Sequence, residues 1–360
     1  MLQVDNHTPF SAALSVFPNL AGVESAYAVV KATFQFGTDG PELAPVQLPL
    51  LAADVFWGDT LSTSLRSVGE FGLPRPSTDV LLVGRAIAPA ADTRVADVHI
   101  QVGPVHRSVR VFGDRRWTRS GGRWRPSVPE PWERMPLRWE LAWGGLGVAR
   151  QGGVPDHEPR NPVGRGFVGH DDAPVHDQPL PNLEDPDGLI ADPQDRPTPA
   201  CFAPIAPTWM PRRRFAGTYD AAWLRKRAPY LPQDFDPRFF QVAPEALVAP
   251  GHLQGGEPVI LDGFSLGEPL SFTLPACGLS IAFDLDGTEV AAQAALEMLL
   301  FEPDAGRLQM LWRAGIEVDK KVLKLRRAIV RSSVYESDGH ERGPLVASRA
   351  GWPAAYAGGL

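Results

Sequence analysis

Thirty-seven prolines and 35 glycines constrain this 360-residue chain more than any other feature, because they are spread between short apolar runs along its whole length. Proline removes a backbone donor and clashes with the preceding helical turn, and glycine weakens helices by its conformational freedom. Short apolar runs between such breaks are typical of many short strands joined by defined turns. The sequence therefore predicts a mainly β protein with few short helices.

Alternation of apolar and polar residues predicts where the strands lie. Residues 27–36 read YAVVKATFQF, in which Lys31, Thr33 and Gln35 share one face and apolar residues the other. We expect a strand that is buried on one face only. The run TDVLLVG at 78–84 is typical of a strand buried on both faces.

Two further segments give clear patterns. LRWELAW at 137–143 alternates so that Trp139 and Trp143 share one side, which predicts a strand with both indoles in the core. EMLLFEPDAGRLQMLW at 297–312 predicts a hairpin whose turn lies at 303–306. Strands therefore dominate both the beginning and the end of the chain.

The middle of the chain has a different character. Residues 147–250 are rich in proline and almost free of periodicity, so we expect an ordered loop cap laid over the sheets. One short helix is predicted in this cap, with Asp220 as the N-cap of AAWLRKR. The predicted organisation is sandwich-like, with two antiparallel sheet regions at 1–146 and 251–334, the cap between them, and a flexible tail at 335–360.

Composition excludes several classes of function. The formal net charge of -7 gives no positive field to attract nucleic acid. No apolar run approaches the length that spans a membrane, and the N-terminal residues do not form a signal peptide. Cys201 and Cys277 are too few for a disulfide scaffold. We expect a cytoplasmic protein that binds neither nucleic acid nor membrane.

Three strings resemble catalytic or ligand motifs, but their context does not support them. GFSLG at 263–267 matches a hydrolase nucleophile elbow, yet a strand pattern follows it where the elbow needs a helix. GRGFVG at 164–169 lacks the flanking strand and helix of a dinucleotide site. The histidines and acids between 156 and 177 do not have metal-ligand spacing. We therefore predict no catalytic residue, no cofactor and no metal; the alternative is a hydrolase or carbohydrate-active enzyme that uses carboxylates of the cap, such as Glu184, Asp220 and Asp234.

A set of strings, in a fixed order from residue 27 to about 275, resembles one protein family. They are YAVVKATF (27–34), TDVLLVG (78–84), VFGDRRW (111–117), MPL (135–137), NPVGRGF (161–167), LPNLE (180–184), GTYD (217–220) with Trp223, and LPQDFD (231–236). Their joint occurrence resembles the domain-of-unknown-function 2169 family, whose members act as effector adaptors or chaperones of type VI secretion. The chain beyond Ser333 matches nothing in this pattern.

The resemblance implies a non-catalytic protein of the bacterial cytoplasm that binds a toxic effector and helps to load it onto a VgrG-type spike or its PAAR tip. It transfers no catalytic residue. We predict that the motif positions order the cap and, secondarily, contact a partner. These positions are Asn161, Gly164, Arg165, Gly166, Asn182, Glu184, Thr218, Asp220, Trp223, Asp234 and Phe235.

Overall fold

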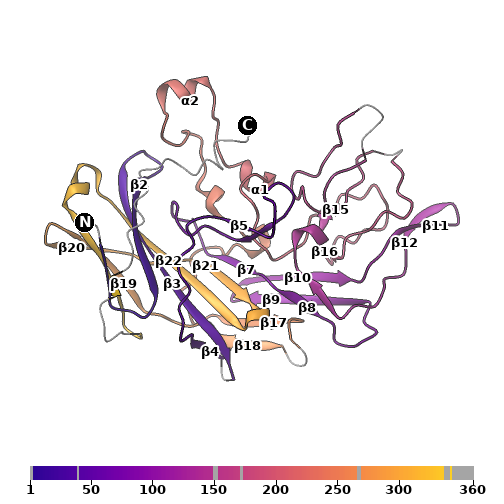
Figure 1. The fold of residues 1–360 in the computed structure, drawn as a ribbon, viewed down its shortest axis with the longest axis horizontal. Helices are drawn as coiled ribbons and strands as arrows, with labels where there is room; N and C mark the ends of the chain where they lie inside the picture. The colour runs from indigo at the N-terminus through magenta and orange to yellow at the C-terminus, as the bar shows by residue number, and fades with distance from the viewer. Residues whose placement is uncertain are drawn as a thin grey trace.

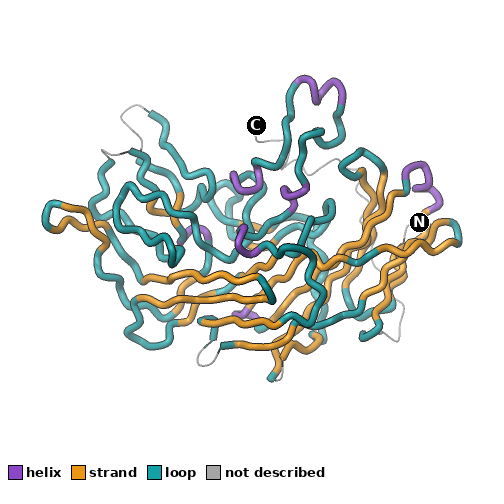
Figure 2. Tube along the Cα trace, turned by 180° about the vertical axis from the view of Figure 1, so that it is seen from behind, coloured by secondary structure: helices purple, strands orange, loops and turns teal. Residues whose placement is uncertain are grey.

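The computed structural model describes residues 3–38, 40–148, 153–170, 173–265 and 269–335, together with the backbone of a short strand at 341–342. Three larger sheets lie side by side beneath a layer of loops (Figures 1 and 2). The mainly β class with antiparallel sheets and short helices is therefore confirmed. None of the helices in these ranges is long and apolar enough to cross a membrane.

The main sheet combines strands from both ends of the chain. In spatial order its strands are β2 (Ser11–Pro18), β3 (Glu24–Gly37), β22 (Arg307–Glu317), β21 (Ala295–Glu302) and β7 (Asp79–Leu82), with β4 (Gly40–Leu43) beside β3. β22 pairs antiparallel with β3, and β7 pairs parallel with β21. Strands of the two predicted sheet regions thus pair directly with each other.

Two five-stranded sheets flank the main sheet. The second sheet has the order β16 (Leu183–Glu184), β10 (Val105–Phe112), β9 (Val95–Val102), β17 (Pro258–Asp262) and β18 (Leu270–Thr273). The third has the order β20 (Thr288–Ala292), β19 (Leu279–Leu285), β23 (Leu325–Ser332), β1 (Gln3–Asn6) and β24 (Glu341–Arg342). One hydrophobic cluster contains residues of all three sheets, so they share a core.

The remaining elements are short. Four strand pairs are β5 (Val55–Phe56) with β6 (Leu65–Ser67), β8 (Arg85–Ile87) with β13 (Arg134–Pro136), β11 (Trp117–Ser120) with β12 (Arg123–Pro126), and β14 (Trp143–Gly144) with β15 (Arg165–Gly166). The α-helices are α1 (Met210–Arg213) and α2 (Ala221–Lys226). Short 3-10 helices lie at Trp139–Leu141, Pro237–Phe240, Glu245–Leu247, Pro303–Ala305 and Asp319–Lys324.

The proline-rich segment forms an ordered loop layer, as its sequence predicts. Its middle part is buried as deeply as a strand, since Cys201, Phe202 and Ala203 have no exposed surface. The backbone N–H of Leu82 at the end of β7 donates to the carbonyl of Phe202 over 3.1 Å. The layer therefore contributes to the core as well as covering it.

Two local predictions are wrong. The predicted strand at 137–143 is absent: Trp139–Leu141 form a 3-10 turn and only Trp143 belongs to a strand, the two-residue β14, although Trp139 and Trp143 are buried as predicted. β3 is buried on both faces through most of its length, and Lys31 and Thr33 lie inside. The tail at 335–360 is predicted to be flexible. Apart from Tyr335 and the backbone of β24, its residues lie outside the described ranges.

Candidate functional site: a braced loop layer with a projecting helix

A buried ion pair joins the second sheet to the loop layer. Arg115 follows β10, and Glu184 ends the neighbouring strand β16. Arg115 Nη2 donates to Glu184 Oε1 and to the carbonyl of Pro181, while Glu184 Oε2 accepts from the backbone N–H of Ile190 over 2.8 Å. Burial raises the pKa of Glu184 against the opposing effect of Arg115. Because desolvation offsets much of the attraction, the pair serves mainly to fix where the chain runs.

Asn161 holds the next stretch of the layer. Its side chain is fully buried, and Nδ2 donates to the carbonyls of Trp139 over 2.8 Å and Trp143 over 3.0 Å. Gly164 packs against this amide so closely that a Cβ would lie 2.4 Å from the Asn161 nitrogen. Gly166 has a φ of 86°, and a Cβ there would lie 2.7 Å from the Pro181 ring. The glycines of this string therefore permit close packing of loops, and among the residues described up to His170 no helix follows them that could hold a phosphate.

Arg165 and Asn182 connect these two stretches. Arg165 Nε donates to the carbonyl of Glu140 over 3.1 Å, and its Nη1 donates to Asn182 Oδ1 over 3.2 Å. Asn182 Nδ2 donates in turn to the carbonyl of Phe112 over 3.1 Å and to Asp114 Oδ1 over 3.0 Å. Six of the predicted positions, from Asn161 to Glu184, thus lie in one continuous set of contacts.

A hollow of about 210 Å³ opens beside this set. Arg165 and Gln178 are the polar side chains of its wall, and most of the rest is apolar, including Trp117 and Phe167. Its volume is smaller than the roughly 300–1,000 Å³ typical of small-molecule sites. The hollow is large enough for an apolar side chain of a partner.

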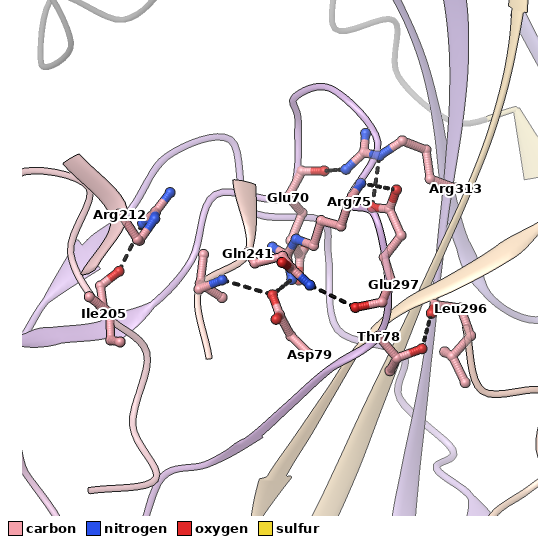
Figure 3. A network of polar contacts seen from close by, with 12 residues as sticks. Glu70, Arg75, Thr78, Asp79, Ile205, Arg212, Gln241, Leu296, Glu297 and Arg313 are labelled. Carbon is pink, nitrogen blue, oxygen red and sulfur yellow. Dashed lines mark hydrogen bonds and ion pairs between the residues drawn. The ribbon is translucent and has the colours of Figure 1, made fainter. Parts of the chain in front are cut away.

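A second set of buried charges lies where the loop layer meets the main sheet (Figure 3). Arg313 of β22 donates from Nε to Glu297 Oε2 of β21 over 2.9 Å, and from Nη2 to the carbonyl of Glu70 over 2.9 Å. The other oxygen of Glu297 accepts from the backbone N–H of Arg75 over 2.9 Å. Arg75 then pairs with Asp79 of β7 over 3.2 Å. These contacts tie the segment between residues 70 and 79 to the main sheet.

Asp79 extends this set into the loop layer. Its Oδ2 accepts from the backbone N–H of Val242 over 2.8 Å. Burial raises the pKa of the Asp79 carboxyl, against the opposing effect of Arg75. Close to this carboxylate, the buried Arg212 donates to the carbonyls of Ile205 over 2.8 Å and Phe239 over 3.0 Å. The loop layer is therefore attached to the main sheet through charged groups of both, Asp79 of the sheet and Arg212 of the layer.

Residues 215–240, here called the projection, stand out from the loop layer and carry α2 at their tip (Figures 1 and 2). At its neck, Thr218 donates from its backbone N–H and its hydroxyl to the two carboxylate oxygens of Asp234, over 3.0 and 2.7 Å. These bonds hold the pKa of Asp234 below its ordinary value. Gly217 has a φ of 76°, and a Cβ there would lie 2.9 Å from Pro232. The two sides of the neck are thus in direct contact.

Further contacts fix the tip and the base of the projection. Asp220 Oδ1 accepts from the backbone N–H of Trp223 over 2.8 Å, which confirms the predicted N-cap. The indole N–H of Trp223 donates to the carbonyl of Tyr230 over 2.8 Å. At the base, the ring of Phe235 packs 5.4 Å from that of Phe239. The projection is therefore held in a defined conformation by its own hydrogen bonds and ring contacts.

The predicted positions form two groups, one around Arg115 and Glu184 and one in the projection. Glu184, Asp220 and Asp234, the carboxylates of the enzymatic alternative, each hold a different part of the loop layer. Arg75, Asp79 and the other charges of Figure 3 were not identified from the sequence as a set. The only signal there was the charged pair with four-residue spacing at the start of a strongly apolar strand.

The described residues of the hydrolase-like string GFSLG and of the histidines and acids between 156 and 177 lie in turns and loops. The described part of GFSLG, Gly263–Ser265, follows β17, which pairs antiparallel with β18, while Leu266 and Gly267 lie outside the described residues. His176 lies 3.7 Å from Asp177, and both are exposed. Asp171 and Asp172 lie outside the described residues. Within the described ranges, no three His, Cys, Asp or Glu side chains form a group that could hold a metal.

These features define a class of mainly β protein in which buried charges fasten an ordered, proline-rich loop layer onto three sheets. The chain belongs to the family described as "Uncharacterized protein conserved in bacteria (DUF2169)", whose model matches residues 21–313. The predicted family is therefore confirmed. No curated protein and no solved structure matches the chain.

Proposed function

We propose that this protein is a non-catalytic adaptor that binds a toxic type VI secretion effector in the bacterial cytoplasm and helps to load it onto a VgrG-type spike or its PAAR tip. Membership of the family supports the proposal, because the motif strings resemble those of a family whose members are expected to have this role. The identity of the partners rests on that resemblance. The physical argument concerns how such a protein would hold a partner.

The observation that carries the proposal is the projection. Its neck is closed by Thr218 and Asp234, its base is packed through Phe235, and its tip carries the exposed side chain of Leu224. A surface that is already ordered loses little conformational entropy when it binds, so more of the contact energy appears as affinity. The motif positions of this region hold the projection in place, as expected for an element that presents other residues to a partner.

The enzymatic alternative receives less support. General acid–base catalysis by two carboxylates needs both of them to face one substrate. Glu184 is buried against Arg115. Asp220 caps α2, and Asp234 closes the neck of the projection through Thr218. Each carboxylate thus has a structural partner, and we do not propose a hydrolase on these residues.

Co-expression tests the proposal. The tagged full chain is produced together with the toxin and the spike proteins encoded beside it, and complexes are purified by affinity and size-exclusion chromatography. We expect the toxin, the spike protein or both to remain bound at a defined stoichiometry. A toxin from an unrelated secretion locus serves as the control. Failure to retain any neighbouring protein, or equal retention of the control, would contradict the proposal.

A further inference from the structure

The orientation of α2 decides which side chains of the projection are free. Trp223 and Arg227 lie four residues apart and therefore share one face of the helical turn. The indole N–H of Trp223 donates to the carbonyl of Tyr230. Arg227 donates to the carbonyl of Leu231 over 2.8 Å and to the carbonyl of Leu20, in the turn before β3, over 2.7 Å. This face is occupied in holding the helix against the rest of the chain.

The opposite face of α2 is exposed. Leu224 retains 66% of its surface, and Arg225 and Lys226 beside it are also exposed. Since the helix is held by its other face, these three side chains contribute little to its stability. A branched apolar side chain followed by two cations is well suited to a contact in which it becomes buried.

The projection has a charge opposite to that of the chain. Residues 215–240 contain four basic and three acidic side chains, a formal net charge of +1, whereas the whole chain has a formal net charge of -7. Each of the three acids already has a partner: Asp220 caps α2, Asp234 binds Thr218, and Asp236 pairs with Arg238 over 2.5 Å. The cations at the tip therefore present a local positive field on an acidic molecule.

We infer that the exposed face of α2, formed by Leu224, Arg225 and Lys226, docks onto an acidic surface of the partner polypeptide that has an apolar depression for Leu224. The inference rests on the proposed function and specifies the chemistry of the partner. Charge complementarity of this kind steers association, and the buried leucine adds affinity at short range. The acidic remainder of the chain repels an acidic partner elsewhere, so it orients the partner toward the projection.

Charge reversal at the tip tests the inference. The full chain, its R225E/K226E variant and its L224S variant are titrated with the neighbouring toxin or spike protein that co-expression retains, and Kd is measured by biolayer interferometry at two salt concentrations. We expect R225E/K226E to raise Kd about tenfold or more and L224S to raise it about fivefold. Wild-type Kd should rise with salt, and the charge-reversed variant should lose most of this dependence.

The matched control is R123E/R125E, which reverses two exposed arginines on β12, in the two-stranded pair with β11. We expect its Kd to remain within about twofold of wild type, and all variants to keep the wild-type melting temperature. Equal weakening by the control would overturn the inference, because it would show attraction without a defined site. Unchanged binding by R225E/K226E would overturn it and leave the adaptor function standing.

Two other outcomes are equally decisive. If the wild-type chain binds none of the neighbouring proteins, the adaptor function fails and the inference fails with it. If light scattering shows that the chain forms a dimer that L224S dissociates, the face is occupied by a second copy, and the inference is again overturned.

Discussion

The ammonium of Lys31 lies 2.8 Å from a carboxylate oxygen of Glu70, and the two side chains are 1% and 2% exposed. The same ammonium donates to the carbonyl of Pro49, and Glu70 accepts from the backbone N–H of Leu51 over 2.7 Å. The pair therefore fixes the segment around residues 49–51 against β3 of the main sheet.

Removal of one partner of this pair should be costly. Lys31→Met is expected to lower the free energy of unfolding by about 3–5 kcal/mol, because it leaves the buried Glu70 carboxylate without the ammonium that pairs with it directly. The double variant K31M/E70Q should regain most of this loss, since glutamine carries no charge and still accepts from Leu51. Urea denaturation measures both changes. A double variant no more stable than K31M would show that the loss comes from the packing of Lys31.

Asn161 gives a test of the loop layer. Asn161→Ala should lower the free energy of unfolding by about 1–3 kcal/mol, because the carbonyls of Trp139 and Trp143 lose their donor. Asn161→Asp keeps the shape but places a carboxylate against those carbonyls, so it should cost more than alanine. The control is Gln178→Glu, the same chemical change at an exposed residue, with an expected effect below about 0.5 kcal/mol. Equal stability of the N161D and N161A proteins would contradict the orientation of the amide.

Elements with local signals could be predicted from the sequence. The hairpin of β21 and β22 follows from alternation on both sides of its turn, and α2 follows from its N-cap at Asp220. Both signals depend on residues within a few positions of each other. The ordered state of the loop layer also follows, because a long irregular segment in a compact domain is stable only where it packs.

The features that could not be predicted from the sequence depend on contacts between residues that are far apart in the chain. Lys31 alternates like an exposed residue, but Glu70, 39 positions later, makes its burial possible. At 137–143, the indole of Trp139 donates to the carbonyls of Ala203 and Pro204, and Asn161 takes the Trp139 carbonyl. These polar partners replace a strand ladder, and none of them is near in sequence. The same holds for the network of Figure 3.

Gly166 should tolerate no side chain. Gly166→Ala is expected to lower the free energy of unfolding by about 2–4 kcal/mol, since it adds a clash with Pro181 to the strain of a positive φ. Gly121→Ala is the control, because its φ is also positive, at 58°, but no atom lies within 4 Å of the added Cβ. Its cost should be about 1–2 kcal/mol. Thermal and urea unfolding give the difference; equal costs would show that the loop yields to the methyl group.

The neck of the projection should depend on the ionised form of Asp234. Hydrogen bonds from the Thr218 hydroxyl and then its backbone N–H hold the pKa of Asp234 below its ordinary value of 3.8. A carboxyl with a lowered folded pKa contributes stability above its unfolded pKa and loses that contribution as pH falls through the folded value. Acidification below about pH 3.8 should therefore loosen the neck, while neutral pH leaves it closed.

Hydrogen exchange measures this loosening directly. At pH 6, Asp234→Asn should reduce the protection of backbone amides in residues 217–224 relative to wild type, because the two Thr218 donors bind different carboxylate oxygens and one of these becomes an NH2 group that cannot accept. Once the pH has fallen through the lowered pKa of Asp234, and after correction for intrinsic exchange rates, the two proteins should converge, since the wild-type carboxyl is then protonated as well. Thr218→Val, which removes the hydroxyl alone, should give an intermediate loss at pH 6. Equal protection of wild type and D234N at pH 6 would show that the neck is held by packing at Gly217 and Pro232 rather than by the carboxylate.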